Sequence, residues 1–196
     1  MADETYDLKK MQRKLKKYLD ADRYQHTMGV MYTAAALAMN YNCDIVKAQV
    51  AGLLHDCAKN IPNKKKLKMC QKYKITVSDL ERENPFLLHA KLGAFLAETK
   101  YEVTDMEILD AITWHTTGTS NMSFLEKIIY IADYIEPNRC KAPNLKEVRR
   151  LAFQDINECM YHILRDTLGY LGKNPKTTDP ATEEAYLFYS NMHNSK

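Results

Sequence analysis

The sequence predicts an all-α fold. Apolar residues recur at spacings of three and four along nearly all of the 196 residues, which is the period of a helix that buries one face. Alternating apolar and polar residues, which mark a half-buried strand, are scarce. Glycine and proline number only six each, so few positions interrupt a helix. A chain of this length can bury roughly 70% of the surface that it exposes when unfolded, so we expect one domain over residues 1–196.

The first four helices are expected near residues 7–20, 24–40, 44–58 and 64–74. In each stretch the apolar residues fall on one helical face. The third stretch contains the apolar run VKAQVAGLLHDCAK, and the fourth contains the basic run NKKKLK. We interpret the basic run as a solvated helix face.

Capping boxes locate the starts of later helices, because a polar side chain caps the first turn and a glutamate three residues on reaches back to it. Four pairs fit this pattern: Ser78 with Glu81, Thr104 with Glu107, Ser123 with Glu126, and Asn144 with Glu147. The remaining helices are expected near residues 86–98, 105–115, 124–135, 145–170 and 180–191. Loops are expected at EPNRCKAPN (136–144) and GKNPKTTDP (172–180).

Composition argues against several classes of protein. The five cysteines include no C-x-x-C pair, which argues against a zinc ribbon or a redox motif and favours reduced thiols. No stretch reaches the ~20 apolar residues of a spanning helix, and the first residues lack the apolar core of a signal peptide. We therefore expect a cytoplasmic protein with no membrane partner. The net charge of +3, from 28 basic and 25 acidic residues, does not predict a nucleic-acid partner.

The dipeptide His55-Asp56 ends an apolar helix, and its neighbours Leu53 and Leu54 predict burial. A buried, ionised aspartate needs a partner, and a metal ion is one such partner. The alternative is structural: the helix dipole favours a histidine near a C-terminus, and Asp56 would bond the neighbouring backbone. The dipeptide by itself leaves both interpretations open.

Asp133 lies in FLEKIIYIADYIEP, where apolar residues surround it on nearly all sides of a helix. A carboxylate there is costly unless it is bound to metal or paired, and a buried salt bridge with an arginine is the alternative. His26, His89 and His115 each lie on an otherwise apolar helix face, where a lone histidine is usually a satisfied core residue. Four such imidazoles with two carboxylates and no thiolate suit iron, manganese, cobalt or zinc rather than a structural zinc site.

In chain order these residues read H, HD, H, H and D, which resembles the metal-binding signature of the HD phosphohydrolase superfamily. The resemblance implies an all-helical HD domain with a divalent metal, iron being favoured and the number of ions, one or two, being open. It implies that the metal is held by His26, His55, Asp56 and Asp133. His89 and His115 would then bind a second metal or the phosphate.

The finer resemblance is to the bacterial YqeK family. It is carried by RYQHTMGV, AGLLHDCAKN, NPFLLHAKLGA, AITWHTTG and IYIADYIEPNR, and it runs from about residue 11 to residue 189. Members of that family are symmetrical diadenosine tetraphosphate hydrolases, which implies metal-dependent cleavage of the four-phosphate bridge into two ADP. Family members often carry I-H-P-x-T-x-x-A-x-N in a late loop, where this chain reads T-D-P-A-T-E-E-A-Y. Asp179 replaces that histidine, so the nucleotide contact of the histidine is not carried over.

Hydrolysis of a phosphoanhydride needs a nucleophile near pH 7 and cations at the phosphoryl oxygens. We expect Asp56 to be catalytic because it would bridge or orient the attacking water. We expect the same of Lys59, which lies three residues on and would share its helix face, so that its ammonium group reaches a phosphate oxygen. Arg23 and Arg139 are candidates for binding phosphates, because a guanidinium can form two parallel bonds to one. A solvated lysine and surface arginines are the alternatives. The other expected nucleotide contacts are His89, His115, Thr116, Gly172, Lys173, Asn174, Lys176 and Thr177.

Three other functions are compatible with some of these features. Another HD phosphohydrolase, acting on deoxynucleoside phosphates or guanosine polyphosphates, would share the metal core. A helical module without catalysis would bind a nucleotide or a partner protein. RNA binding through the basic run at 64–68 is not expected at this net charge. The expected partner is a small dinucleotide, and a homodimer is considered although no surface in the sequence predicts it.

Overall fold

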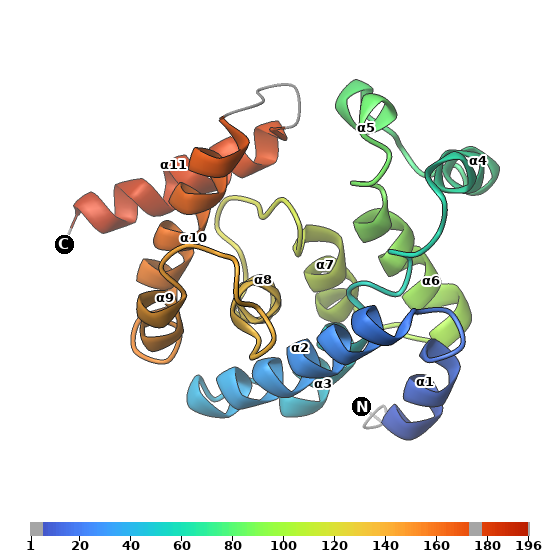
Figure 1. The fold of residues 1–196 in the computed structure, drawn as a ribbon, viewed down its shortest axis with the longest axis horizontal. Helices are drawn as coiled ribbons and strands as arrows, with labels where there is room; N and C mark the ends of the chain where they lie inside the picture. The colour runs from blue at the N-terminus through green and yellow to red at the C-terminus, as the bar shows by residue number, and fades with distance from the viewer. Residues whose placement is uncertain (1–5, 173–177, 196) are drawn as a thin grey trace.

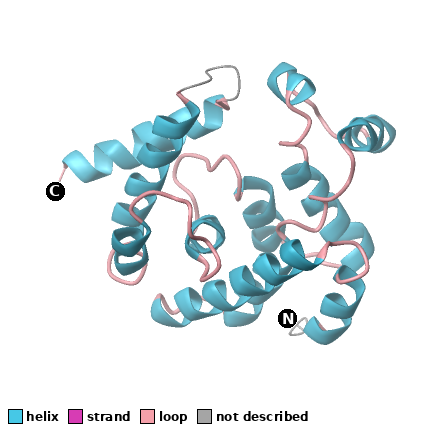
Figure 2. Ribbon diagram, viewed as in Figure 1, coloured by secondary structure: helices cyan, strands magenta, loops and turns pink. Residues whose placement is uncertain are grey.

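The structure is a computed structural model that describes residues 6–172 and 178–195, and Figure 1 shows how its helices are arranged. Every regular element in these residues is helical, as Figure 2 shows, so the predicted all-α fold is confirmed. None of these helices has the length and apolar character that crossing a bilayer requires. The helices are α1 (Leu8–Leu15), α2 (Ala21–Asn40), α3 (Ile45–Leu54), α4 (Asn63–Tyr73), α5 (Asp79–Glu83), α6 (His89–Tyr101), α7 (Met106–Trp114), α8 (Phe124–Ile135), α9 (Leu145–Leu151), α10 (Ile156–Leu171) and α11 (Pro180–Asn194).

Helix α8 lies in the middle of the fold and packs against α2, α3, α7 and α10 (Figure 1). Eight of its twelve residues are buried, because its sequence is apolar on nearly all sides. Ile128, Ile129 and Ile131 are fully buried and belong to the main hydrophobic core. A polar residue on this helix, such as Asp133, therefore has to find its partners inside the protein.

Helices α2 and α3 pack closely, and Gly52 sets their separation. A Cβ atom at Gly52 would lie 3.0 Å from the Cα of Met31 and 3.3 Å from its backbone nitrogen. Ala48 and Ala51, also on α3, are fully buried. The small residues let α3 approach the backbone of α2, which brings His55 to within 5.5 Å of His26, measured between the ring centroids.

Two of the four predicted capping boxes are confirmed, and two are wrong. Asp105 rather than Thr104 caps α7, because its carboxylate accepts a hydrogen bond from the backbone N–H of Glu107. Asn144 precedes α9 at φ 55°, and its side chain makes no capping hydrogen bond. The confirmed boxes begin α5 and α8, although α5 lies outside the helix ranges that we expected. They pair Ser78 with Glu81 and Ser123 with Glu126.

The helix expected over residues 145–170 is in fact two helices, α9 and α10. The break follows Leu151, and Asp155 begins the next helix because its carboxylate accepts hydrogen bonds from the N–H groups of Asn157 and Glu158. Ala152 and Ile156, on the two sides of the break, are both buried. The apolar pattern therefore continues across a break that only the capping residue marks.

Candidate metal centre

Six residues that the sequence singled out come together in the middle of the fold. They come from five different parts of the chain: α2, the end of α3, the start of α6, the end of α7, and α8. Their ligand atoms form three overlapping groups in which all atoms lie within 4.8 Å of one another. The groups are His26 with His55 and Asp56, His55 with His115 and Asp133, and Asp56 with His89 and His115.

Three of the four imidazoles are held in the same way. Each directs its Nδ1 at the backbone carbonyl of the residue three positions earlier, at 2.7 Å. Because a carbonyl oxygen only accepts hydrogen bonds, Nδ1 has to carry the proton. The other ring nitrogen, Nε2, then faces the centre in each case. The bonds run from His55 to Gly52, from His89 to Phe86 and from His115 to Ile112.

The fourth imidazole, His26, is held by Glu136, a residue that the sequence interpretation missed. Its Nδ1 lies 3.0 Å from Oε1 of Glu136, whose side chain is fully buried. The other carboxylate oxygen of Glu136 accepts hydrogen bonds from the backbone and the side-chain nitrogen of Asn138. A Cβ at Gly29 would lie 2.4 Å from that oxygen, so the glycine makes room for it. The available signal was an acidic residue directly after the apolar helix that carries Asp133.

Several of the inward-facing acceptor atoms have no hydrogen-bond donor in the described chain. Nε2 of His89 lies 3.2 Å from Nε2 of His115, and Oδ1 of Asp56 lies 3.3 Å from the first and 3.5 Å from the second. Asp56 Oδ1 and the Nε2 atoms of His26 and His55 are buried without a hydrogen-bond partner in the described chain. Converging lone pairs at these distances repel one another unless a cation lies among them. The donor set therefore fits a divalent metal ion.

The ionisation states agree with that fit except at His26, where burial opposes protonation but the carboxylates of Asp133 and Glu136 raise the pKa. Burial lowers the pKa of His55 to about 4, and burial together with nearby Lys59 lowers the pKa of His89 to about 4, so both rings are neutral at pH 7. Burial opposes ionisation of Asp56, but His55 and the other neighbouring histidines hold its pKa well below its usual value. Burial likewise opposes ionisation of Asp133, whose pKa His26 keeps low. Neutral imidazole and carboxylate are the forms that bind metal.

Both arginines predicted for phosphate binding lie at the centre and pair with its carboxylates. Nη1 of Arg23 lies 2.8 Å from Oδ2 of Asp56, and Nη2 of Arg139 lies 2.6 Å from Oδ1 of Asp133. The arginine pair that was the alternative for Asp133 is therefore present, together with a 3.0 Å contact to Nε2 of His26. The side chain of Asp133 is 22% exposed, because one side of it opens to a hollow rather than to the core.

Lys59 and Thr116 also reach the centre. Nζ of Lys59 lies 2.9 Å from Nε2 of His89 and 3.5 Å from Oδ1 of Asp56. The prediction that Lys59 and Asp56 share a helix face is wrong, because α3 ends at Leu54 and a turn follows. That turn nevertheless brings the two side chains together. Oγ1 of Thr116 lies 3.1 Å from Nε2 of both His89 and His115.

Of the loop expected at residues 172–180, the structure describes Gly172 and residues 178–180. Gly172 is exposed at the end of α10. Asp179, which stands where the related family often has histidine, caps α11 by accepting a hydrogen bond from the N–H of Ala181. Four of the predicted nucleotide contacts lie outside the described residues, namely Lys173, Asn174, Lys176 and Thr177.

Two hollows adjoin the centre, and Thr116 lines both of them. One has a volume of about 400 Å³ and is lined by Lys59, Asp133 and Arg139, with Tyr130 at its wall. The other, also about 400 Å³, lies between α5, α6, α7 and the start of α11, with Trp114 in its lining. Thr116, whose hydroxyl reaches the centre, therefore borders two spaces, each with an aromatic side chain in its lining.

Known proteins resemble this chain over most of its length. The HD domain matches residues 23–138. The chain is 41% identical to the symmetrical bis(5'-nucleosyl)-tetraphosphatase of Bacillus subtilis, over 88% of this chain and 91% of that protein. It is 33% identical to the protein of the same name from Staphylococcus aureus, over 94% of this chain and 95% of that protein.

A solved structure agrees with these matches. The crystal structure of an HD superfamily hydrolase from Clostridium acetobutylicum has a TM-score of 0.91 and 38% identity, covering 96% of this chain and 99% of that one. The HD match spans more than half of the chain, and the relatives span nearly all of it. The chain therefore belongs to the HD-domain family and, within it, to the YqeK family of symmetrical bis(5'-nucleosyl)-tetraphosphatases.

Proposed function

We propose that this protein hydrolyses diadenosine tetraphosphate symmetrically and releases two molecules of ADP. The observation that carries the proposal is the buried cluster of four histidines and two aspartates, together with two hollows that share Thr116. A dinucleotide with two like halves needs a central site for its phosphates and a space for a nucleoside at each end. The relatives from Bacillus subtilis and Staphylococcus aureus are named for symmetrical cleavage of such a compound.

The proposed ligands of the ion are His26, His55, Asp56 and Asp133, with His89 and His115 holding a second ion or a phosphate oxygen. The inward Nε2 atoms and the unpartnered oxygen of Asp56 support this assignment. Asp56 is in two of the three groups and can serve two ions. Imidazole and carboxylate donors without thiolate suit iron, manganese, cobalt or zinc. Of these we propose iron, which the resemblance to the HD superfamily favours. When bound, such an ion withdraws charge from phosphoryl oxygens and makes water a stronger acid.

Three cationic side chains are proposed to bind the phosphates. Arg23, Lys59 and Arg139 lie within 3.5 Å of a cluster carboxylate, and their side chains are 30%, 33% and 42% exposed. They therefore bridge the buried centre and the solvent. A polyphosphate offers charged acceptor oxygens like those of the carboxylates, so it can take over these donors as it enters.

The reaction forms one bond and breaks one. The oxygen of a water molecule bonds to one of the two inner phosphorus atoms, and the bond from that phosphorus to the bridging oxygen of the inner pair breaks. One ADP keeps the bridging oxygen, the other gains the oxygen of the water with one of its protons, and the second proton passes to solvent. Asp56 is proposed to orient the water through its Oδ1. Lys59 is proposed to donate a hydrogen bond to the bridging oxygen as negative charge develops on it.

The test combines metal analysis with product analysis for the wild type, Asp56→Ala and Asp79→Ala. Asp79 is an exposed carboxylate on α5 and serves as the matched control. We expect bound transition metal and ADP as the only product from the wild type and the control. The Asp56→Ala protein should lose both.

Other results would contradict the proposal in distinct ways. AMP and ATP as products would mean asymmetric cleavage. Bound metal without turnover of diadenosine tetraphosphate would support the metal centre but not this substrate. It would point instead to deoxynucleoside phosphates or guanosine polyphosphates. A folded protein with neither metal nor turnover would be a helical binding module. Manganese, cobalt or zinc in place of iron, in protein purified without oxygen, would overturn only the choice of metal.

A further inference from the structure

Basic residues are segregated along this chain. Residues 8–19 and 57–78 contain thirteen of the 28 lysines and arginines but none of the 25 aspartates and glutamates. The rest of the chain carries 15 basic and 25 acidic residues. The net charge of +3 is therefore the sum of a strongly basic part and an acidic remainder. The expectation of no nucleic-acid partner rested on the net charge, so it does not apply to the basic part taken by itself.

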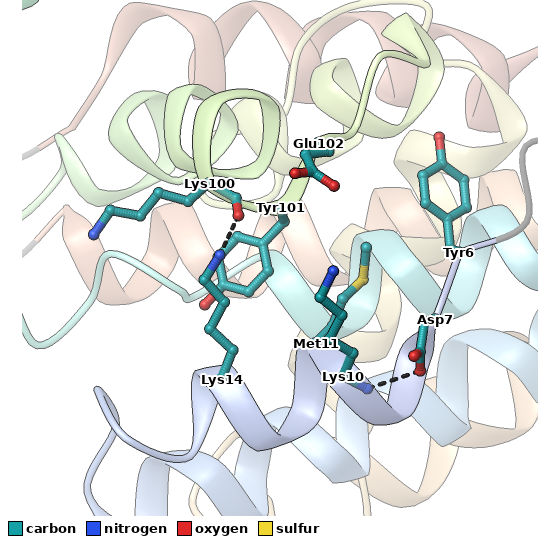
Figure 3. Close-up of a pocket in the computed structure, with 8 residues that line it drawn as sticks. All are labelled: Tyr6, Asp7, Lys10, Met11, Lys14, Lys100, Tyr101 and Glu102. Atoms are coloured by element: carbon teal, nitrogen blue, oxygen red, sulfur yellow. Dashed lines mark hydrogen bonds between the residues drawn. The ribbon is translucent and has the colours of Figure 1, made fainter.

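The two basic stretches fold onto one side of the molecule. They include α1 and α4, which lie on the same side as the C-terminal end of α6 (Figure 1). A hollow of about 800 Å³ lies between α4 and α6, and a second of about 330 Å³ lies between α1 and the end of α6 (Figure 3). Lys100 and Tyr101 line both hollows. We call the larger hollow the basic groove; the smaller one is of mixed charge, because Asp7 and Glu102 line it beside Lys10 and Lys14.

The larger hollow is lined by cations without carboxylates. Four exposed lysines face it, Lys65, Lys68, Lys72 and Lys100, and none of its described lining residues is acidic. None of these four forms an ion pair with a carboxylate of the described chain, whereas other lysines, such as Lys91, do. The positive potential of the hollow is therefore not neutralised within the protein.

Aromatic side chains also line the larger hollow, next to these lysines. The rings of Tyr73 and Phe95 lie 4.5 Å apart between centroids, and Tyr73 is 42% exposed. Tyr18 is 55% exposed, and Nζ of Lys100 lies 5.1 Å from the centre of its ring. In the smaller hollow, Lys14 donates a hydrogen bond to the backbone oxygen of Lys100 and lies over the ring of Tyr101, which helps to join the two hollows (Figure 3).

We propose that the basic groove binds single-stranded nucleic acid. A groove that combines lysines for the phosphates with exposed rings for the bases is the usual surface for that ligand. The four lysines of the groove, spread over α4 and the end of α6, can contact more than one phosphate. A membrane surface fits less well, because the rings line a concavity rather than project from the molecule. This inference is independent of the reaction at the metal centre.

The experiment measures binding of a fluorescent oligouridylate of about 12 nucleotides by anisotropy. Uridylate avoids competition from adenine recognition at the metal centre. If four lysines contact phosphates, the affinity should fall about 50-fold between 50 and 200 mM salt, given a slope of about −0.7 per contact for single strands. Binding that is absent at 50 mM salt would overturn the proposal.

Matched variants separate the groove from overall charge. Lys68→Glu with Lys72→Glu, one turn apart on α4, should weaken binding at least tenfold, whereas Lys146→Glu with Arg150→Glu, one turn apart on α9, should leave it nearly unchanged. Tyr73→Ala should weaken binding about tenfold, and Tyr170→Ala, which removes an exposed ring from α10, should not. Hydrolysis of diadenosine tetraphosphate should be the same in all four proteins.

Two results would reject the groove as the binding surface. An equal loss of affinity in the α9 variant would mean that binding of the oligonucleotide depends only on the net charge of the protein. Tighter, groove-dependent binding to vesicles containing phosphatidylglycerol than to the oligonucleotide would identify an anionic membrane as the ligand instead.

Discussion

Nδ1 of His26 lies 3.0 Å from Oε1 of Glu136, although 110 positions separate the two residues in the sequence. Glu136 is fully buried and is held in turn by the backbone N–H of Asn138 at 2.8 Å. A carboxylate behind a histidine fixes which ring nitrogen carries the proton, and it makes the other nitrogen a better donor to metal. Glu136 therefore positions His26 without occupying the centre itself.

The first prediction concerns this contact. Glu136→Gln preserves the size of the side chain but removes its charge, so we expect metal affinity to fall 10- to 100-fold. Affinity is measured by competition with a chelator, and circular dichroism verifies the fold. Glu147→Gln, at an exposed position on α9, is the control. If Glu136→Gln kept wild-type metal affinity, Glu136 would have only a structural role.

The second prediction compares two glycines. Gly52→Ala places a Cβ 3.0 Å from the backbone of Met31 and should cost about 1–3 kcal/mol of unfolding free energy, because α2 and α3 must separate. Gly169→Ala on α10 meets no atom within 4 Å and should add about 0.5–1 kcal/mol, because alanine favours a helix interior. Urea denaturation measures both. Equal effects would show that the approach of α2 and α3 is not tight.

The third prediction concerns the hollow beside Thr116 that contains Trp114. If a nucleoside stacks there, Trp114→Leu should raise KM for diadenosine tetraphosphate about tenfold and change kcat less, since Trp114 lines the hollow but provides no ligand to the centre. Steady-state kinetics gives both constants. Phe153→Leu removes an exposed ring that follows α9 and should change neither. A loss confined to kcat would place Trp114 in support of the centre instead.

The fourth prediction concerns the cap of α7. Burial opposes ionisation of Asp105, but Lys47 and the N–H of Glu107 hold its pKa below the ordinary value of 3.8. A lowered pKa stabilises the fold above pH 3.8, and this contribution is lost as the pH falls through the folded value. Asp105→Ala should therefore cost about 1 kcal/mol at pH 7. Urea denaturation should show a smaller difference near pH 3.5, and a difference that did not depend on pH would exclude the carboxylate as the cause.

The sequence predicted much of the centre because chemistry makes its residues conspicuous. An ionised aspartate such as Asp133 on an apolar helix is costly without a partner, and histidines on apolar faces share that property. All six predicted residues converge in the structure. Glu136 was missed because it looks like an ordinary charged residue at a helix end. Only the three-dimensional approach of α2 to the end of α8 reveals its partner.

The fold was predictable where local signals agreed. Ser123 with Glu126 predicted the start of α8, and the apolar period predicted its body. The separation of α9 from α10 was not predicted, because Ala152 and Ile156 keep the apolar pattern while Asp155 alone begins a new helix. Lys59 reaches Asp56 through a turn, which periodicity cannot describe.

The bonds from His55, His89 and His115 to carbonyls three residues earlier make each ring part of its own local turn. The orientation of these rings is therefore set by the backbone where a helix begins or ends, rather than by the side chains packed around them. Substitutions on the exposed faces of α3, α6 or α7 that leave Ala48, Ala51 and Gly52 unchanged can accumulate without retuning the centre, as long as those termini stay in place. Evolution can thus reshape what surrounds the centre, and with it the choice of substrate, while the ligands keep their orientation.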